Sequence, residues 1–410
     1  MRHVRVAVFL VAVFSQIQSA AAINGTPSWF ESRIATVPSG FYVSSPSLAF
    51  DHYGTPSVSW SQVETTPGTN TVRHSHFLGL GLWSTRDVAS GSGSGMLTSL
   101  AFDRSERPMI AWVNSNGTVQ GSFNGGAAQS IGTDALTTTP SIDITYDLSG
   151  TLHGMYGRTT AGNLFDIRHT GGTFSSSDMT TLPGVLTVID AAMAVDGRGL
   201  RHVAARTNLS GGNQGLVIAS QPLFGGTWPS ATLATASNVT GVDIAVNPNS
   251  GLAALAYTTY DSGTNTSKLF YTRFTGFALE TTELQSSTGH RFEDVSLAFD
   301  LSDGLPAIAY ERKVISSSAE ELWLAYTNNG TSWLTSLVDG SIKMDAPAGR
   351  PRRPSLAFDD YGTSWPAIAY VDADGGLNVA FDPPVPEPSA LALLAILLGV
   401  RRRRPGRQMI

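Results

Sequence analysis

The chain has 410 residues, of which 14% are charged, 42 are glycine and none is cysteine. The lack of cysteine excludes disulfides, thiol catalysis and cysteine-based metal sites, and the scarcity of charge beside many turn-forming residues is typical of β-rich proteins. Residues 23–382 carry 19 basic and 31 acidic residues, a net charge near −12, which argues against nucleic-acid partners because such binding needs phosphate neutralisation.

Residues 1–22 predict a secretory signal peptide. Arg2 and Arg5 give a positive start, residues 6–14 are apolar, and residues 19–22 are small. This order of charged, apolar and small residues is that of a cleavable export signal, and the apolar run is too short to span a bilayer.

A short apolar strand that ends in Asp or Asn recurs seven times, at 47–51, 99–103, 143–147, 192–196, 243–247, 296–300 and 355–359. A second strand, which often begins with proline, follows most copies, and a third and fourth are visible in several. A period near 50 residues with several strands per unit is typical of propeller blades. The sequence predicts an all-β fold, a seven-bladed β-propeller of four-stranded antiparallel blades over about residues 27–382. An open solenoid, or six or eight blades, are the alternatives.

The first strand of each unit places a small residue before a large one, as in Ala49–Phe50 and Ala298–Phe299. Since successive strand residues point to opposite faces, each blade has a bulky and a shallow side, which suits stacking around an axis. The last unit ends after its third strand, at 377–382, and residues 29–37 form an orphan strand ahead of the first unit. We expect this N-terminal strand to close the last blade and remove an open sheet edge.

Several recurring side chains fit either a structural or a functional interpretation. The strand-ending aspartates fit type I turns better than a catalytic or calcium series. The aromatics that end the second strands are expected to pack between blades, although they could stack on sugars; they are Trp60, Trp112, Tyr156, Tyr257, Tyr310 and Tyr370. His74 and His76 lack a visible third metal ligand. Residues 372–375 resemble the start of a calcium loop without its later glutamate. No cofactor or metal is therefore expected, with Ca²⁺ as the alternative.

One concentration of charge is the candidate ligand site. Loops that lead into first strands and loops that join second to third strands open on the same face of a propeller. In the sixth and seventh units they carry His290, Arg291, Glu293, Asp294, Glu311, Arg312, Arg350, Arg352 and Arg353. We expect these residues to gather over the channel mouth, where they form a ligand site or a solvated charged surface.

The C-terminal segment combines three features in order. Pro386, Glu387 and Pro388 precede an apolar run of 11 residues at 390–400, and Arg401, Arg402, Arg403 and Arg404 follow. This resembles the PEP-CTERM sorting signal of Gram-negative bacteria, so residues 383–404 are predicted to be a linker, a short transmembrane helix and a cytoplasmic arginine cluster. The resemblance implies recognition by an exosortase, secretion machinery as a partner, and delivery to the cell surface, outer membrane or extracellular matrix.

The repeats are also similar to sialidase-like propellers with Asp-box turns. Only a degenerate copy of that motif occurs, at 328–333, where Asn takes the position of the Asp. The sequence therefore favours a non-enzymatic binding or scaffold protein, with exopolysaccharide as the suggested partner. The alternative is a glycoside hydrolase or lyase that uses Glu293, Asp294 and Glu311 as acid and base.

Overall fold

The computed structural model describes residues 27–382, with gaps at 45, 66–67, 94, 136–140, 158–162, 171, 182–184, 210–213, 222–229, 236–237, 276–277, 344–352 and 360–365. The predicted signal peptide, the sorting motif Pro386–Glu387–Pro388 with its arginines, Arg350 and Arg352 lie outside the described residues. Within the described ranges, no helix is long and apolar enough to cross a membrane.

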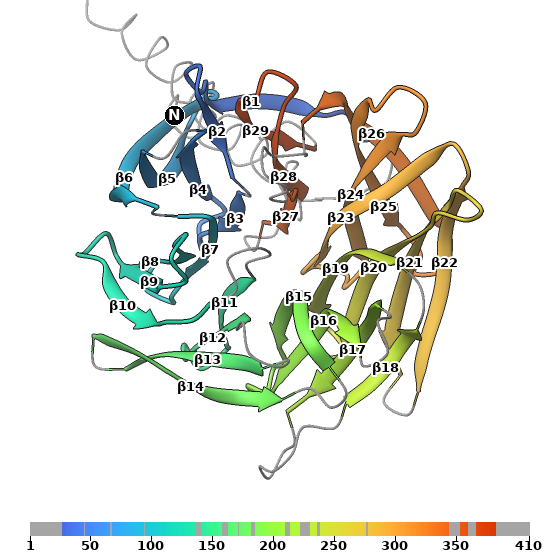
Figure 1. Cartoon of the computed structure of the whole chain (residues 1–410), viewed down its shortest axis with the longest axis horizontal. Helices are drawn as coiled ribbons and strands as arrows, with labels where there is room; N and C mark the ends of the chain where they lie inside the picture. The colour runs from blue at the N-terminus through green and yellow to red at the C-terminus, as the bar shows by residue number, and fades with distance from the viewer. Residues whose placement is uncertain are drawn as a thin grey trace, which may run out of the picture.

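The described strands form seven antiparallel sheets arranged in a ring around a central channel, as the sequence predicts (Figure 1). Blades 1 to 3 comprise β2 (Phe41–Val43), β3 (Ser47–Phe50), β4 (Pro56–Glu64), β5 (Thr69–Gly79) and β6 (Leu82–Ser92); β7 (Leu97–Phe102), β8 (Pro108–Val113), β9 (Val119–Phe123) and β10 (Gln129–Gly132); and β11 (Ile142–Tyr146), β12 (Leu152–Gly157), β13 (Asn163–Thr170) and β14 (Thr173–Thr181).

Blades 4 to 6 continue the same order of four strands. They comprise β15 (Val185–Val195), β16 (Arg201–Leu209), β17 (Gln214–Ser220) and β18 (Ser230–Thr235); β19 (Asn238–Val246), β20 (Ala253–Asp261), β21 (Thr266–Phe274) and β22 (Leu279–Ser287); and β23 (His290–Phe299), β24 (Pro306–Val314), β25 (Glu320–Thr327) and β26 (Trp333–Ile342). Blade 7 comprises β27 (Ser355–Phe358), β28 (Pro366–Val371), β29 (Leu377–Phe381) and the N-terminal β1 (Phe30–Ala35).

The two ends of the described chain meet in blade 7, which confirms the predicted closure. Strand β1 pairs antiparallel with β29, with Phe30 opposite Phe381. Arg33 forms an ion pair with Asp372, and the Ser28 amide donates a hydrogen bond of 2.8 Å to Asp382 Oδ1. The N-terminal strand therefore covers the outer edge of β29 and ties the two ends of the described chain together.

Blade 1 departs from four strands because its inner strand is in two pieces. Both β2 and β3 pair with β4, which makes a five-stranded sheet. Pro46 lies between the two pieces and has no N–H to donate to the ladder, so pairing is interrupted there.

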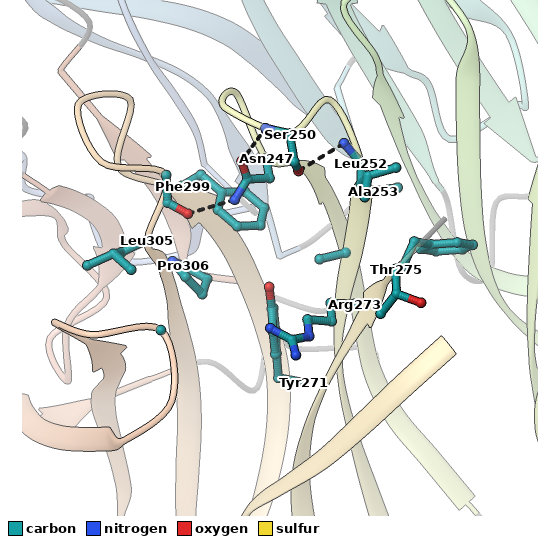
Figure 2. A pocket seen from close by; sticks show the side chains of 14 residues that line it. Asn247, Ser250, Leu252, Ala253, Tyr271, Arg273, Thr275, Phe299, Leu305 and Pro306 are labelled. Carbon is teal, nitrogen blue, oxygen red and sulfur yellow. Dashed lines mark hydrogen bonds between the residues drawn. The ribbon is translucent and has the colours of Figure 1, made fainter. Parts of the chain in front are cut away.

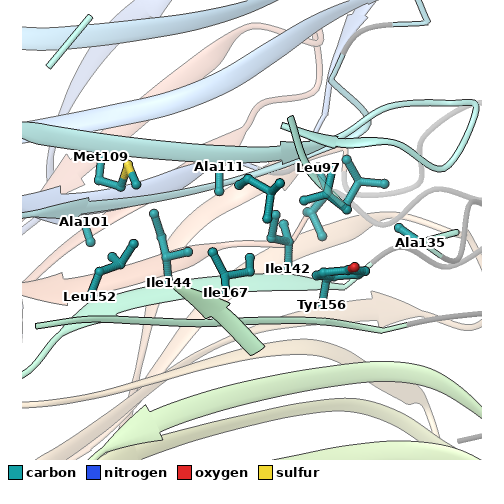
Figure 3. Packing of buried hydrophobic residues seen from close by; sticks show 13 residues of the cluster. Leu97, Ala101, Met109, Ala111, Ala135, Ile142, Ile144, Leu152, Tyr156 and Ile167 are labelled. Atoms are coloured by element: carbon teal, nitrogen blue, oxygen red, sulfur yellow. The ribbon is translucent and has the colours of Figure 1, made fainter. Parts of the chain in front are cut away.

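The hydrophobic core is divided among the seven interfaces between blades. The cluster between blades 2 and 3 joins Met109 and Ala111 to Ile144, Leu152 and Ile167 (Figure 3), and each of the other interfaces has its own cluster. The second-strand aromatics are all buried in or beside these clusters. They are therefore packing residues, and their faces are not available to stack on sugars.

The strand-ending aspartates make turns. Asp51 Oδ1 accepts the amides of Tyr53 and Thr55 at 2.9 and 2.8 Å, and Asp103, Asp147 and Asp196 repeat this arrangement. A glycine with positive φ usually completes the turn, as at Gly54. These anchor turns, together with the turns between third and fourth strands, lie on one side of the ring, which we call the anchor face. The opposite side is the mouth face.

Candidate functional site

On the mouth face, the structure joins blades that are far apart in the ring. Asp190 of β15, Asp294 of β23 and Arg353, just before β27, occupy equivalent positions in blades 4, 6 and 7. Arg353 Nη1 lies 2.6 Å from Asp190 Oδ1, and Arg353 Nε lies 3.8 Å from Asp294 Oδ1. Arg353 therefore links its neighbour, blade 6, with blade 4 on the far side of the channel. Sequence reasoning predicted two of these residues and missed Asp190.

Local irregularities place these side chains. Strands β15, β19 and β23 each carry a β-bulge at this level, and bulges re-aim side chains. Asp294 has a φ of 38°, in the left-handed region. Gly241 lies so close to it that a Cβ there would stand 2.8 Å from the Asp294 amide nitrogen. A glycine is therefore required where β19 meets the β23 bulge.

The carboxylates at the mouth favour the charged form of Arg353. Burial alone would lower the pKa of Arg353, but Asp190 and Asp294 outweigh it and raise that pKa. Burial lowers the pKa of Arg206, and the nearby Asp190 carboxylate partly opposes this shift. The Arg206 guanidinium also donates hydrogen bonds to the carbonyls of Val239 and Thr240, at 3.2 and 3.1 Å. The mouth is thus a paired network that ties blades together.

The remaining predicted charges that the structure describes lie on blade 6, and most of them are paired. Arg312 contacts His290 Nε2 at 2.7 Å and Glu321 at 3.3 Å, and its guanidinium covers the Trp323 ring at 4.6 Å. Arg291 pairs with Glu293. Glu293 stands opposite Glu311, which is only 1% exposed. A ligand role for this predicted cluster stays a prediction.

Below the mouth, the first strands of all seven blades line an axial cavity of about 150 Å³. In six of the seven blades, one polar side chain accepts the backbone amide of the next blade's first strand, at 2.7–3.1 Å. We call these residues the axial belt; they are Ser47, Ser99, Asp143, Asp243, Ser296 and Ser355. Blade 4 breaks the belt with Ala192, and the amide that Ala192 cannot serve, Ile244 N–H, bonds Asp243 Oδ1 instead.

The two belt carboxylates differ from the serines in charge. Burial raises the pKa of Asp143 to about 6 and that of Asp243 to about 7, while hydrogen bonds from backbone amides partly oppose the shift. Among the described residues, no group of three or more His, Asp or Glu side chains could hold a metal ion. Of the weaker metal candidates, His74 is buried, and burial lowers its pKa to about 4. Asp372 caps its own turn by accepting the Gly376 amide at 2.8 Å.

The anchor face carries a separate cleft of about 370 Å³ between blades 5 and 6 (Figure 2). Its rim is made by the anchor turns that begin at Asn247 and Asp300. In these two turns, the amides of Gly251 and Gly304 donate to the carbonyl four residues earlier. The corresponding glycine amides in blades 1, 3 and 4 donate to the carbonyl three residues earlier. The cleft therefore lies between two blades whose anchor turns are one residue longer than the described anchor turns of blades 1 to 4.

Three side chains give the cleft its chemistry, namely Asn247, Tyr271 and Arg273. Asn247 replaces the usual aspartate, and its amide nitrogen donates to Gly304 O at 2.7 Å, which bridges the blades. The Tyr271 ring lies in the wall, 5.1 Å from the ring of Trp333 of the next blade. Burial raises the Tyr271 pKa to about 12, so its hydroxyl stays a donor. Arg273, exposed on the same strand, pairs with Glu280 at 2.7 Å.

Cross-blade comparison shows what is particular to the cleft. On the third strand of blade 5, Tyr271 comes directly after Phe270, which pairs with the buried second-strand aromatic Tyr257. The equivalent residues in the other blades are His74, Gly121, Asp166, Ile218, Leu324 and Val379. A large aromatic occurs there in blade 5 alone. Sequence reasoning missed this site, although the longer turns and the Asn at position 247 are visible in the sequence.

No protein family profile matches the chain, and no curated protein matches it. Solved structures do share its fold. BBS1N in complex with ARL6DN aligns with 88% of this chain and 98% of its own at 9% identity and a TM-score of 0.51. A protein of unknown function from Dyadobacter fermentans aligns over 86% and 97% at 11% identity and 0.50. The Hadza microbial sialidase Hz136 aligns over 85% and 66% at 12% identity and 0.47. At these identities the similarity establishes the propeller fold alone.

Proposed function

We propose that this protein is a non-enzymatic, saccharide-binding β-propeller whose binding site is the cleft between blades 5 and 6. The observation that carries the proposal is the combination in one recess of an aromatic wall, at Tyr271, with polar groups at Asn247 and Arg273. A sugar ring presents an apolar face and a rim of hydroxyls, so it needs such a wall and such donors. The cleft volume is within the range of small-molecule sites.

The charges of the cleft favour a neutral sugar over an acidic one. Arg273 is balanced by Glu280, with Nη2 and Oε2 2.7 Å apart, so the recess offers little net charge. In the acidic body of this chain, a neutral glycan also avoids long-range repulsion. Export by the N-terminal signal and sorting by the PEP-CTERM-like tail remain part of the proposal, and they would present the cleft to exopolysaccharide at the cell surface.

The carboxylates on which a hydrolase would depend are less well suited. Glu311 is buried, Glu293 pairs with Arg291, and Asp294 faces Arg353. Acid and base catalysts of a glycosidase flank the scissile bond with their carboxyl groups exposed to it. This arrangement supports binding over hydrolysis as the function.

A glycan-array screen of the full chain tests the proposal, followed by titration of the best glycan. Tyr271→Ala should weaken binding by about tenfold or more, which corresponds to about 1.4 kcal/mol of lost contact. Arg273→Ala should weaken binding as well, and its matched control is Arg168→Ala, since Arg168 holds in blade 3 the strand position that Arg273 holds in blade 5 and is likewise exposed and paired. We expect Arg168→Ala to bind like the parent.

Hydrolysis of the same glycans is measured in parallel. Turnover that disappears in Glu293→Gln or Glu311→Gln would replace the binding proposal with the hydrolase. Equal loss of binding in Tyr271→Ala and Arg168→Ala would remove the cleft as the site.

A further inference from the structure

The turn between β5 and β6 differs from the fully described equivalent turns of blades 2 and 6. It exposes Leu78, Leu80 and Leu82, which are 64%, 45% and 60% accessible. The same turn in blade 2 carries Asn124 and Gly125, and in blade 6 it is the polar segment 328–332. We call these three leucines the leucine tip.

The backbone of the tip is also unusual. Gly79, Leu80 and Gly81 have φ values of 90°, 56° and 72°, so three successive residues are left-handed. Glycine tolerates this conformation, whereas a leucine there is strained because its Cβ crowds the backbone. Asn or Gly would relieve the strain at position 80. An exposed leucine held in a strained conformation points to a role for its side chain outside the fold.

The tip lies where the described chain ends. Trp83 Nε1 donates to Ser32 Oγ of the closing strand at 3.0 Å, and Ser32 Oγ donates to Gly81 O at 3.2 Å. The ring of Phe77, just before the tip, is 5.6 Å from that of Phe381. Opposite Phe381 stands Phe30, which is exposed. An apolar surface therefore surrounds the point from which residues after Asp382 continue.

The sequence after Asp382 indicates what this apolar surface contacts. Seven residues, 383–389, separate Asp382 from the apolar run at 390–400, and seven extended residues reach at most about 25 Å. A membrane that takes up the run must therefore lie close to the leucine tip. The run has 11 residues, fewer than the roughly 20 of a stable transmembrane helix, so a second apolar contact would add to a weak anchor.

We propose that the leucine tip, with Phe30 beside it, inserts into the lipid surface and orients the propeller on the membrane. The contact is made at the outer edge of blades 7 and 1. Figure 1 places blades 5 and 6, which bound the cleft, at a different part of the ring from blade 1. The inference rests on uptake of residues 390–400 by a membrane and is independent of saccharide binding.

The absence of cysteine allows a direct test. Leu80→Cys in the full chain is labelled with the environment-sensitive fluorophore NBD and reconstituted into vesicles of phosphatidylcholine and phosphatidylglycerol. We expect a blue shift of its emission and quenching by spin-labelled lipid. The matched control is Leu148→Cys, an exposed leucine in the anchor turn of blade 3, which should show neither. Adding Leu78→Ser and Leu82→Ser should reduce the shift at position 80.

Unchanged emission at position 80 would overturn the proposal, whether or not the chain floats with the vesicles. Equal shifts at 80 and 148 would do the same, because they would indicate non-specific adsorption. A concentration-dependent shift without lipid would make a second copy of the chain the occupant. Flotation of the parent reports separately on the 390–400 run, and the glycan titration is unaffected by either result.

Discussion

Single polar side chains decide how the first strands of neighbouring blades are joined. In the axial belt, a serine hydroxyl or aspartate carboxylate accepts an amide that the next blade cannot satisfy within its own sheet. A buried amide without an acceptor costs about 1–3 kcal/mol. The belt residues therefore stabilise the ring by serving donors that face the channel.

Removal of one belt hydroxyl should be measurable. Ser296→Ala leaves the Leu356 amide without its acceptor at 3.0 Å, so we expect the free energy of unfolding to fall by about 1–3 kcal/mol. Ala192→Ser should change it little, because the Ile244 amide that a hydroxyl there would serve already donates to Asp243 Oδ1. Chemical denaturation measures both. Ser286→Ala, an exposed position on outer strand β22, is the control, and a loss there equal to that of Ser296→Ala would contradict the argument.

Asp243 should make stability depend on pH. Its pKa is raised to about 7, above the ordinary 3.8, so the folded state binds a proton more tightly than the unfolded state. Its contribution is favourable below about pH 4 and is lost as the pH rises to about 7. His74 has a pKa lowered to about 4, so its titration raises the free energy of unfolding as the pH rises over much of this range. The effect of Asp243 is therefore measured as the difference between parent and variant.

Asp243→Asn should therefore gain stability relative to the parent as the pH rises from 5 to 8. Melting temperatures of both proteins across that range provide the measurement. A constant difference between the two curves would show that Asp243 does not titrate in this range.

At the scale of elements, the pattern of strands and turns was predictable and the length of each strand was not. The Asp-x-x-Gly turns follow from local chemistry, because the aspartate accepts amides of its own turn and glycine takes the positive φ. The bulges in β15, β19 and β23 have no comparable local signal. They arise where strands of neighbouring blades approach one another, as Gly241 and Asp294 do.

The closing strand β1 offers a test at this scale. Arg33 contacts Asp372 and Asn378 across more than 300 residues. Arg33→Ala should lower the free energy of unfolding by about 1 kcal/mol and speed amide exchange in β29 and β1. Lys268→Ala removes a similarly exposed pair within blade 5, Lys268 with Glu283, and we expect a smaller, local effect. Equal and local effects of both changes would mean that Arg33 does not secure the closure.

For the whole molecule, the ring distributes one hydrophobic core over seven interfaces and leaves two faces with different properties. The mouth face is crossed by ion pairs, while the anchor face carries the blade 5–6 cleft and the leucine tip. Sequence reasoning placed the candidate site on the mouth face, because charged residues concentrate there. The structure shows most of those charges that it describes paired, and it places a cleft larger than the axial cavity on the opposite face.

The sequence by itself predicted the seven blades, with six or eight as alternatives, and also the turns and the closure, because each follows from a pattern that can be read along the chain. Tertiary structure alone decided that Arg353 meets Asp190 across the channel and that Tyr271 and Asn247 share a cleft with the turn of the next blade. These pairings depend on how bulges and turn lengths tilt neighbouring blades. Such tilts result from packing between residues some 50 to 160 positions apart, and no local pattern records them.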